Sequence, residues 1–321
     1  MTWNIRNGGQ DRGGPDRRTL LARVVAAHRP DVLALQELRG LDVARFAADA
    51  GLTPHLARSP FGQPVAILVD PRWPTPSTGP VRRPFHHAAQ RVTLSTDAGP
   101  LAVLSTHFYP YRGGRRLIEA RWAATALRRA RADLALLAGD LNTLAPYADH
   151  VYHPDHAHHP DHAHHPDHAH HAHDAEHAHR SERAEHGDHA EHAEHAHRAE
   201  HADHADHAEH AHRAEHAESL ARLAPAYRRR HLRRDGRTVD TRAIAHLLAT
   251  GLVDLAATAG PTVPTGHGRT PEFAEMRLDY LLATPALAAR LVDVQVIRTP
   301  DTHQASDHHP VAATFTLTPP T

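Results

Sequence analysis

Six short motifs of the sequence carry residue types that bind metal ions or phosphate, and each borders a short apolar run. In chain order they are TWNIR, LALQE, STHF, GDLN, RLDY and SDHHPV. Their candidate site residues are Asn4, Glu37, His107, Asp140, Asn142, Asp279, Asp307 and His308. Carboxylates are the hard oxygen ligands that Mg²⁺ and Mn²⁺ prefer, and histidine is the most frequent general base. One such motif is common by chance, but the ordered series predicts a site for a metal ion and a phosphate.

Short strands are expected to bring these residues together. Residues 31–35 are an apolar run that predicts a buried strand delivering Gln36 and Glu37, and residues 133–138 lead into the GDLN motif. Further strands are predicted at 64–69, 81–85, 90–95, 101–106, 277–284, 291–298 and 310–317. Helices are predicted at 16–29, 41–50, 115–131 and 238–250. Many strands with a few helices indicate an α/β fold of two sheets with outer helices.

The ordered motif series resembles the endonuclease/exonuclease/phosphatase family of DNase I-like, metal-dependent phosphoesterases. This family includes abasic-site endonucleases, sphingomyelinases and inositol polyphosphate 5-phosphatases. The resemblance extends from Thr2 to about Phe315, apart from a His-rich insertion, and departs only at the first strand, which directly follows Met1. It implies a four-layer α/β-sandwich, in which two packed, mostly antiparallel sheets are flanked by helices and the site lies at the top of the sheets.

The resemblance and the residue chemistry together assign roles to the candidates. Glu37 and Asp307 are expected to bind the metal ion, and Asn4 to support the metal and the phosphate. His308 is expected to act as general base toward the attacking water, while Asp279 orients its ring and stabilises the imidazolium. The alternative for Glu37 is an ordinary surface acid.

Three residues of the GDLN and STHF motifs are expected to position the attacking water and to contact the phosphate. Asp140 would position the nucleophilic water, Asn142 would donate a hydrogen bond to the phosphate, and His107 would contact the scissile phosphate. The alternatives are a plain turn at GDLN and a core histidine at position 107. His309 is expected to be a bystander. The arginines that follow His107 either bind substrate phosphates or form a solvated helix face. These are Arg112, Arg115, Arg116 and Arg121.

Residues 150–216 differ from the rest of the chain and are interpreted as a low-complexity insertion. They hold 25 of the 36 histidines, with 15 acidic residues and 4 arginines, a formal charge of −11 when histidine is neutral. Three HPDHAH copies are followed by Asp/Glu-His-Ala repeats, whose alanine stripe would circle a helix axis. Without a fixed apolar face, the segment is predicted to be a solvated helix or disordered. Residues 1–149 and 217–321 would then form a single domain.

The histidines of this insertion predict binding of Zn²⁺ or Ni²⁺ through neutral imidazole. They would protonate below a pH of about 6.5 and reverse the charge of the segment. The insertion is therefore expected to change how activity depends on pH and on added Zn²⁺. The alternative is a tolerated expansion without function.

Outside the insertion the chain is basic, with 32 arginines, 22 acidic residues and no lysine. This balance suits a phosphate-bearing substrate such as nucleic acid, although codon usage alone can also produce an arginine excess. The absence of cysteine excludes disulfides, thiolate metal sites and a cysteine nucleophile. With no long apolar run and no signal peptide before the first motif, the sequence predicts a soluble, cytoplasmic protein unless its natural start lies upstream.

Three functions follow from these features. The first is a divalent-metal-dependent phosphoesterase that hydrolyses phosphodiester bonds, foremost as a nuclease. The second is a phosphomonoesterase or a sphingomyelinase-like phosphodiesterase on a small or lipid substrate, although no long apolar hairpin for membrane docking is visible. The third is a His-rich metal-binding protein, which would have no need of the catalytic motifs. Endonuclease and exonuclease action, and the oligomeric state, stay open at this point.

Overall fold

Two mixed sheets form the centre of the molecule. The computed structural model describes residues 1–146, 216, 218–267 and 272–320. One sheet consists, in spatial order, of β11 (Leu291–Val296), β12 (Val311–Phe315), β1 (Thr2–Asn4), β2 (Val32–Gln36), β4 (Val65–Val69) and β3 (Thr53–Ala57). The other consists of β5 (Ser77–Pro80), β6 (Ala89–Thr96), β7 (Gly99–His107), β8 (Leu134–Asp140), β10 (Asp279–Ala283) and β9 (Val253–Asp254). The pairs β1–β2 and β7–β8 are parallel, and the remaining pairs are antiparallel.

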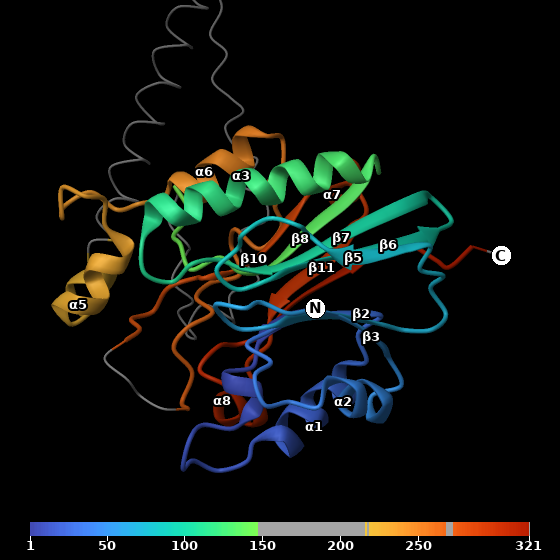
Figure 1. Cartoon of the computed structure of the whole chain (residues 1–321), viewed down its shortest axis with the longest axis horizontal. Coiled ribbons are helices and arrows are strands. Elements are labelled where there is room, and N and C mark those ends of the chain that lie inside the picture. The colour runs from blue at the N-terminus through green and yellow to red at the C-terminus, as the bar shows by residue number, and fades with distance from the viewer. Residues whose placement is uncertain (147–215, 217, 268–271, 321) are drawn as a thin grey trace, which may run out of the picture.

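Helices cover the outer face of each sheet (Figure 1). The first sheet carries α1 (Arg18–His28), α2 (Val43–Asp49) and α8 (Pro300–Ala305), and the second carries α3 (Gly113–Ala130) and α6 (Arg242–Ala249). Shorter helical turns lie in the connections: α5 (Pro225–Arg228), α7 (Pro285–Ala288), η1 (Asn7–Gly9) and η3 (Arg229–His231). The layers are helix, sheet, sheet and helix, which confirms the α/β-sandwich that the motifs implied.

Each pair of neighbouring layers has its own apolar core. Between the sheets, Ile67 of the first sheet packs with Val103 and Leu136 of the second. Strand β8 is buried along its whole length, because sheet residues cover one face and helices cover the other. Its Leu137 points into the core under α3 and α6. This double burial explains why the run before GDLN is continuously apolar.

The structure differs from the sequence prediction at residues 81–85. These residues form no strand, and β5 instead occupies residues 77–80. Pro84 lies within these residues and Pro80 directly precedes them, and proline cannot donate a ladder hydrogen bond. Phe85 accounts for the apolar signal, because it is buried in the core under α3 without being part of a strand.

Helices α7 and α8 were not predicted, although both begin at a Thr-Pro dipeptide. Thr299 is the N-cap of α8, where it forms a capping box with Thr302, and Pro300 is the first helical residue. Thr284 and Pro285 occupy the same positions in α7. Both helices are short, so neither presents enough turns to show an apolar period in the sequence.

The parallel pairs decide where the candidate site lies. Because parallel strands end at the same edge, β1 and β2 present Asn4 and Glu37 together, and β7 and β8 present His107 and Asp140 together. Strand β10 runs antiparallel to β8 and begins with Asp279 at this edge. Residues from both sheets therefore meet at one end of the sandwich.

The predicted insertion at 150–216 lies outside the described residues, except for His216. The ring of His216 is buried, and its Nε2 lies 3.1 Å from the carbonyl oxygen of Ala145.

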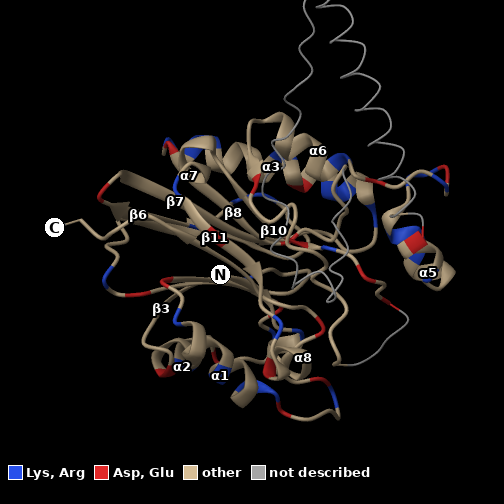
Figure 2. Cartoon of the chain, turned by 180° about the vertical axis from the view of Figure 1, so that it is seen from behind, with Lys and Arg blue, Asp and Glu red and all other residues tan. Residues whose placement is uncertain are grey.

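Figure 2 shows arginine positions on the α3–α6 layer and around α5. Among the described residues, no helix combines the length and the apolar character that crossing a membrane requires.

Candidate active site

Asn4 connects the two sheets at the candidate site. Its Nδ2 donates to Asp140 Oδ2 at 3.0 Å, in the second sheet, and to Glu37 Oε1 at 3.2 Å, in the first. Its Oδ1 accepts from the backbone N–H of Arg6 at 3.0 Å, which fixes the orientation of the amide. Asn4 is buried, so these bonds are made away from solvent. The amide thus holds two carboxylates at a fixed separation.

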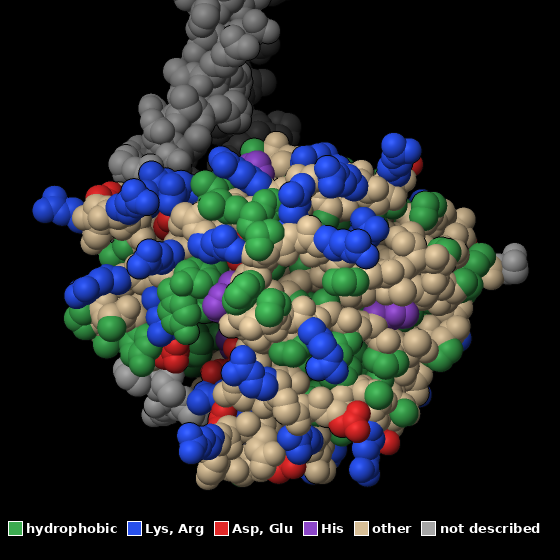
Figure 3. Space-filling model, in the orientation of Figure 1, with side chains coloured by type: hydrophobic (Ala, Val, Ile, Leu, Met, Phe, Trp, Pro, Cys, Tyr) green, Lys and Arg blue, Asp and Glu red, His purple; other side chains and the backbone are tan. Residues whose placement is uncertain are grey.

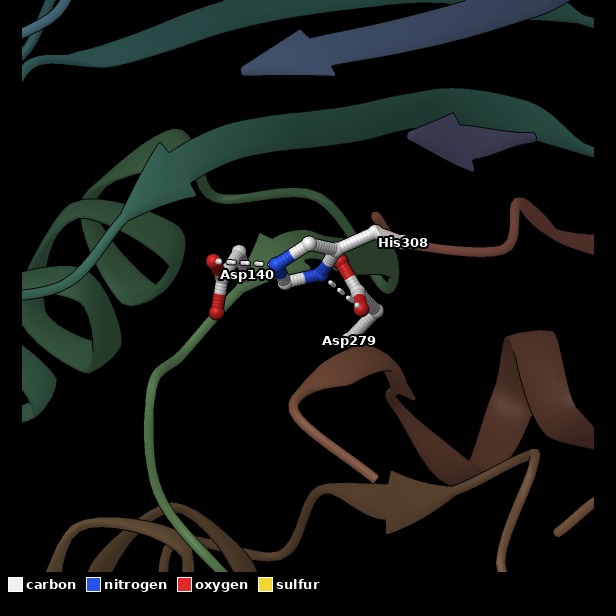
Figure 4. Close-up of side chains that lie close together, drawn as sticks. All are labelled: Asp140, Asp279 and His308. Atoms are coloured by element: carbon white, nitrogen blue, oxygen red, sulfur yellow. Dashed lines mark hydrogen bonds and ion pairs between the residues drawn. The ribbon is translucent and has the colours of Figure 1, made fainter. Parts of the chain in front are cut away.

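His308 lies between two buried carboxylates (Figure 4). Its Nδ1 is 2.7 Å from Asp279 Oδ2, and its Nε2 is 3.8 Å from Asp140 Oδ2. One ligand atom of each of these three residues lies within 4.8 Å of the others, so the group can also hold a metal ion. The second oxygen of Asp279, Oδ1, is buried and has no hydrogen-bond partner among the described residues.

The backbone of His308 is fixed by neighbours that the motif analysis did not single out. The indole Nε1 of Trp3 donates to the carbonyl oxygen of His308 at 2.8 Å. Ser306 Oγ donates to the carbonyl oxygen of Asn4 at 2.7 Å and accepts from the N–H of His308 at 3.3 Å. Residues near the two ends of the described chain therefore orient the imidazole together.

The charges around His308 determine where its proton lies. Burial alone would lower the pKa of His308, but the carboxylates of Asp279 and Asp140 raise it to about 10. Burial raises the pKa of Asp140 to about 7; His308 opposes this shift and Asp279 adds to it. In the metal-free protein the two carboxylates thus favour the protonated imidazole of His308, and burial favours the neutral form of Asp140.

Glu37 and Asp307 form a second pair of carboxylates on the first-sheet side. Burial, and then repulsion from Asp307, raise the pKa of Glu37. Asn7 donates its backbone N–H to Glu37 Oε2 at 3.1 Å, and Arg6 Nη1 lies 2.8 Å from Asp307 Oδ2. Glu37 also has a positive φ of 62°, which turns it out of the line of β2. Two mutually repelling, oxygen-rich side chains fit a hard divalent cation.

His107 and Asn142 complete the second-sheet side. His107 Nε2 lies 3.4 Å from Asp140 Oδ2, while burial and the neighbouring His87 lower the pKa of His107 well below its usual range. Asn142 donates its backbone N–H to Asp140 Oδ1 at 2.9 Å and its Nδ2 to the carbonyl oxygen of Phe108 at 3.1 Å. The predicted residues of the GDLN and STHF motifs are thus in direct contact.

The remaining histidine and arginine candidates lie elsewhere. His309 is buried away from this group, with Nδ1 at 3.4 Å from Thr302 Oγ1 and its ring against His303. Arg116 is also buried and binds backbone carbonyls, so neither proposed role for the arginines applies to it. Arg112 and Arg121 are exposed.

Sequence reasoning missed His87 as a neighbour of the site. Its ring stacks on that of His107, with centroids 3.9 Å apart and planes 7° apart. Its Nδ1 accepts the backbone N–H of Gln63 at 2.7 Å. The one available signal was the His-His pair at 86–87, and nothing local distinguishes such a pair from a surface loop.

Comparison with known proteins identifies the family. The model of the endonuclease/exonuclease/phosphatase family matches residues 1–308. The chain belongs to this family. It is therefore an enzyme of the class that hydrolyses phosphoester bonds. No curated protein sequence matches the chain.

Solved structures share the fold of this enzyme at low sequence identity. An AP endonuclease from Archaeoglobus fulgidus aligns with a TM-score of 0.56 at 17% identity, covering 98% of each chain. Truncated TDP2 from Caenorhabditis elegans gives 0.55 at 16% identity, covering 98% of this chain and 95% of its own. A variant of the 3′ phosphatase NExo from Neisseria, bound to a product DNA hairpin, gives 0.53 at 17% identity, covering 98% and 97%. At such identities the likeness shows the fold alone.

Proposed function

We propose that the enzyme hydrolyses phosphodiester bonds in nucleic acid with a divalent cation, Mg²⁺ or Mn²⁺. The observation that carries the proposal is the buried contact of His308 with Asp279 and Asp140 at the edge where Asn4 and Glu37 also end. Buried, charged groups of this kind are costly to fold, and groups with strongly shifted pKa values are concentrated at functional sites. The AP endonuclease and the DNA-bound 3′ phosphatase of the same fold support nucleic acid as the substrate class.

Glu37 and Asp307 would hold the cation, with Asn4 beside them. Their fit rests on the donor set, two carboxylates with the Asn4 amide 3.2 Å from Glu37 Oε1. Burial, together with the nearby charge of Asp307, also raises the pKa of Glu37. When bound, the cation would polarise a phosphoryl oxygen and stabilise negative charge in the transition state. The Asp140–Asp279–His308 group is a second set of ligand atoms close enough together to hold an ion. Its short His308–Asp279 hydrogen bond favours proton chemistry there instead.

We assign the general base to Asp140 rather than to His308. A base works best when its pKa lies near the working pH, and the pKa of Asp140 is about 7. His308, with a pKa of about 10, would stay protonated and donate to a phosphoryl oxygen. Asp279 would hold the His308 ring through Nδ1. This assignment differs from the expectation from the family resemblance, in which His308 is the general base and Asp140 positions the water.

Metal dependence and substrate class can be tested in parallel. We expect the enzyme to hydrolyse bis(p-nitrophenyl) phosphate and DNA in Mg²⁺ or Mn²⁺, to lose activity in EDTA and to regain it when the ion is restored, because the cation stabilises the transition state. The panel should include plasmid DNA, an abasic duplex and p-nitrophenyl phosphate as the monoester. Hydrolysis of the monoester alone would favour the phosphomonoesterase alternative, and full activity in EDTA would exclude the metal.

A further inference from the structure

A row of aromatic rings leads from the catalytic centre to the protein surface. His107 stacks on His87 with centroids 3.9 Å apart, and His86 meets His87 edge to face at 4.7 Å. Tyr109 meets His86 at 4.8 Å, and Tyr111 meets Tyr109 at 5.4 Å. His87 is buried, His86 and Tyr109 are half-buried, and Tyr111 is 51% exposed. The exposure of the rings to solvent therefore increases from His87 to Tyr111.

Positive charge continues the row beyond Tyr111. The guanidinium carbon of Arg230 lies 5.0 Å from the ring centroid of Tyr111 and 4.6 Å from that of Tyr227. Residues 225–237 include six arginines and one acidic residue. Four of these arginines are exposed: Arg229, Arg233, Arg234 and Arg237. On the face shown in Figure 3, arginine side chains surround a group of hydrophobic and histidine side chains.

Buried Glu119 of α3 fixes the two loops that carry the rings. Its Oε1 accepts the backbone N–H of His86 at 2.9 Å, and its Oε2 accepts that of Tyr109 at 2.7 Å. Glu119 is 0% exposed, so the carboxylate makes these bonds inside the protein. Hydrogen bonds to a buried carboxylate are stronger than neutral ones, and they hold the loops in register.

Arg116, one turn earlier in α3, fixes the far end of the row in the same way. It is 0% exposed and donates to the carbonyl oxygens of Tyr109 at 3.4 Å, Pro110 at 3.3 Å and Arg230 at 2.6 Å. One helix thus uses two buried charges to fix three separate loops. Such preorganisation lowers the entropic cost that binding must overcome.

We propose that His86, Tyr109, Tyr111 and Arg230 bind unpaired bases of a single-stranded nucleic acid whose scissile phosphate lies at Asp140 and His308. The arginines of 225–237 would contact the phosphates of the same strand. Sequence-independent readers of single strands combine stacking rings with a basic track in this manner. In a duplex the base faces are already stacked, so they cannot use the rings. This proposal rests on the proposed function and names the form of its substrate.

The test compares one strand with a duplex under conditions without cleavage. In EDTA, fluorescence anisotropy would measure binding of a fluorescein-labelled oligothymidine of about 12 nucleotides and of a blunt hairpin duplex with the same number of phosphates. We expect tighter binding of the single strand. Tyr111→Ala should weaken that binding about tenfold, whereas Tyr111→Phe should preserve it, because stacking requires the ring and not the hydroxyl. The double substitution Arg233→Gln and Arg234→Gln should reduce the salt dependence of binding.

Val292→Ala is the matched control, because Val292 is an exposed apolar residue, 62% exposed, on edge strand β11. The affinity of the Val292→Ala variant for the single strand should equal that of the wild type. Unchanged binding by Tyr111→Ala, an equal loss on strand and duplex, or no binding by the wild type would each overturn the proposal. If single-strand binding fails but the wild type still hydrolyses bis(p-nitrophenyl) phosphate in Mg²⁺, only the binding proposal is wrong. Absence of all phosphodiester hydrolysis would instead contradict the proposed function.

Discussion

Replacing Asp140 with asparagine is expected to slow phosphodiester hydrolysis by about 10²–10⁴-fold, the usual contribution of a general base. The amide keeps the shape of the carboxylate but cannot accept a proton from water. It also places an NH₂ group against the donors that now meet Asp140, namely Asn4 Nδ2 and the backbone N–H of Asn142. The measurement is kcat on bis(p-nitrophenyl) phosphate, with circular dichroism to show that the variant is folded.

Asp293→Asn is the control for this variant, because it makes the same chemical change at an exposed position of β11. It should retain the wild-type rate. A folded Asp140→Asn enzyme that keeps a rate within a few-fold of wild type would mean that Asp140 is not the base.

The pH profile distinguishes Asp140 from His308 as the base. With Asp140 as base, the rate should rise with pH through about 7, as this carboxyl loses its proton. It should fall again toward pH 10, where His308 loses the proton that it donates. A rate that keeps rising up to about pH 10 would instead return the role of base to His308.

Replacing Gly139 with alanine is expected to destabilise the protein by about 3 kcal/mol and to displace Asp140, with a large loss of activity. Gly139 has a φ of +148°, and a Cβ there would collide with the carbonyl oxygen of Thr106. Thr106 belongs to the parallel neighbour β7, whose backbone is fixed on both sides by β6 and β8. Urea unfolding would measure the stability, and the phosphodiester assay would measure the activity.

Gly99→Ala separates the clash from the backbone strain. Gly99 also has a positive φ, of +103°, but no atom lies within 4 Å of its added Cβ, apart from those of its own chain neighbours. It should show only the strain, about 1–2 kcal/mol, and keep its activity. Equal destabilisation by the two substitutions would contradict the proposed close approach to Thr106.

The sequence predicts most of this fold because the catalytic strands are buried on both faces. The apolar run before Asp140 and the run before Glu37 are both continuous, and both correspond to observed strands that end at the site. The meeting of Asn4 with Asp140, residues of different sheets, could be inferred only from the family resemblance. Propensity and periodicity describe one strand at a time and contain no information on how two sheets are aligned.

The features that could not be predicted from the sequence, the positions of His87 and Arg116, depend on tertiary contacts of loops. His87 stacks on His107 because Glu119 fixes the neighbouring His86 from a helix, and no local pattern encodes that bond. Arg116 shows the same limit. Its place in an arginine-rich helix indicated substrate binding or solvation, whereas the structure buries it against backbone carbonyls. The sequence gives the type of each residue directly, but whether a residue is buried depends on contacts with segments far away in the sequence.

The contact between β1 and β12 has a consequence for how the enzyme is made. A ribosome releases β1 long before β12, yet β1 lies between β2 and β12 in its sheet. Trp3 and His308, whose hydrogen bond spans 305 residues, can meet only after the ribosome has released the segment that contains His308. Contacts of such long sequence separation slow folding and leave apolar strands exposed meanwhile. The catalytic centre therefore cannot form before the segment that contains His308 has been synthesised.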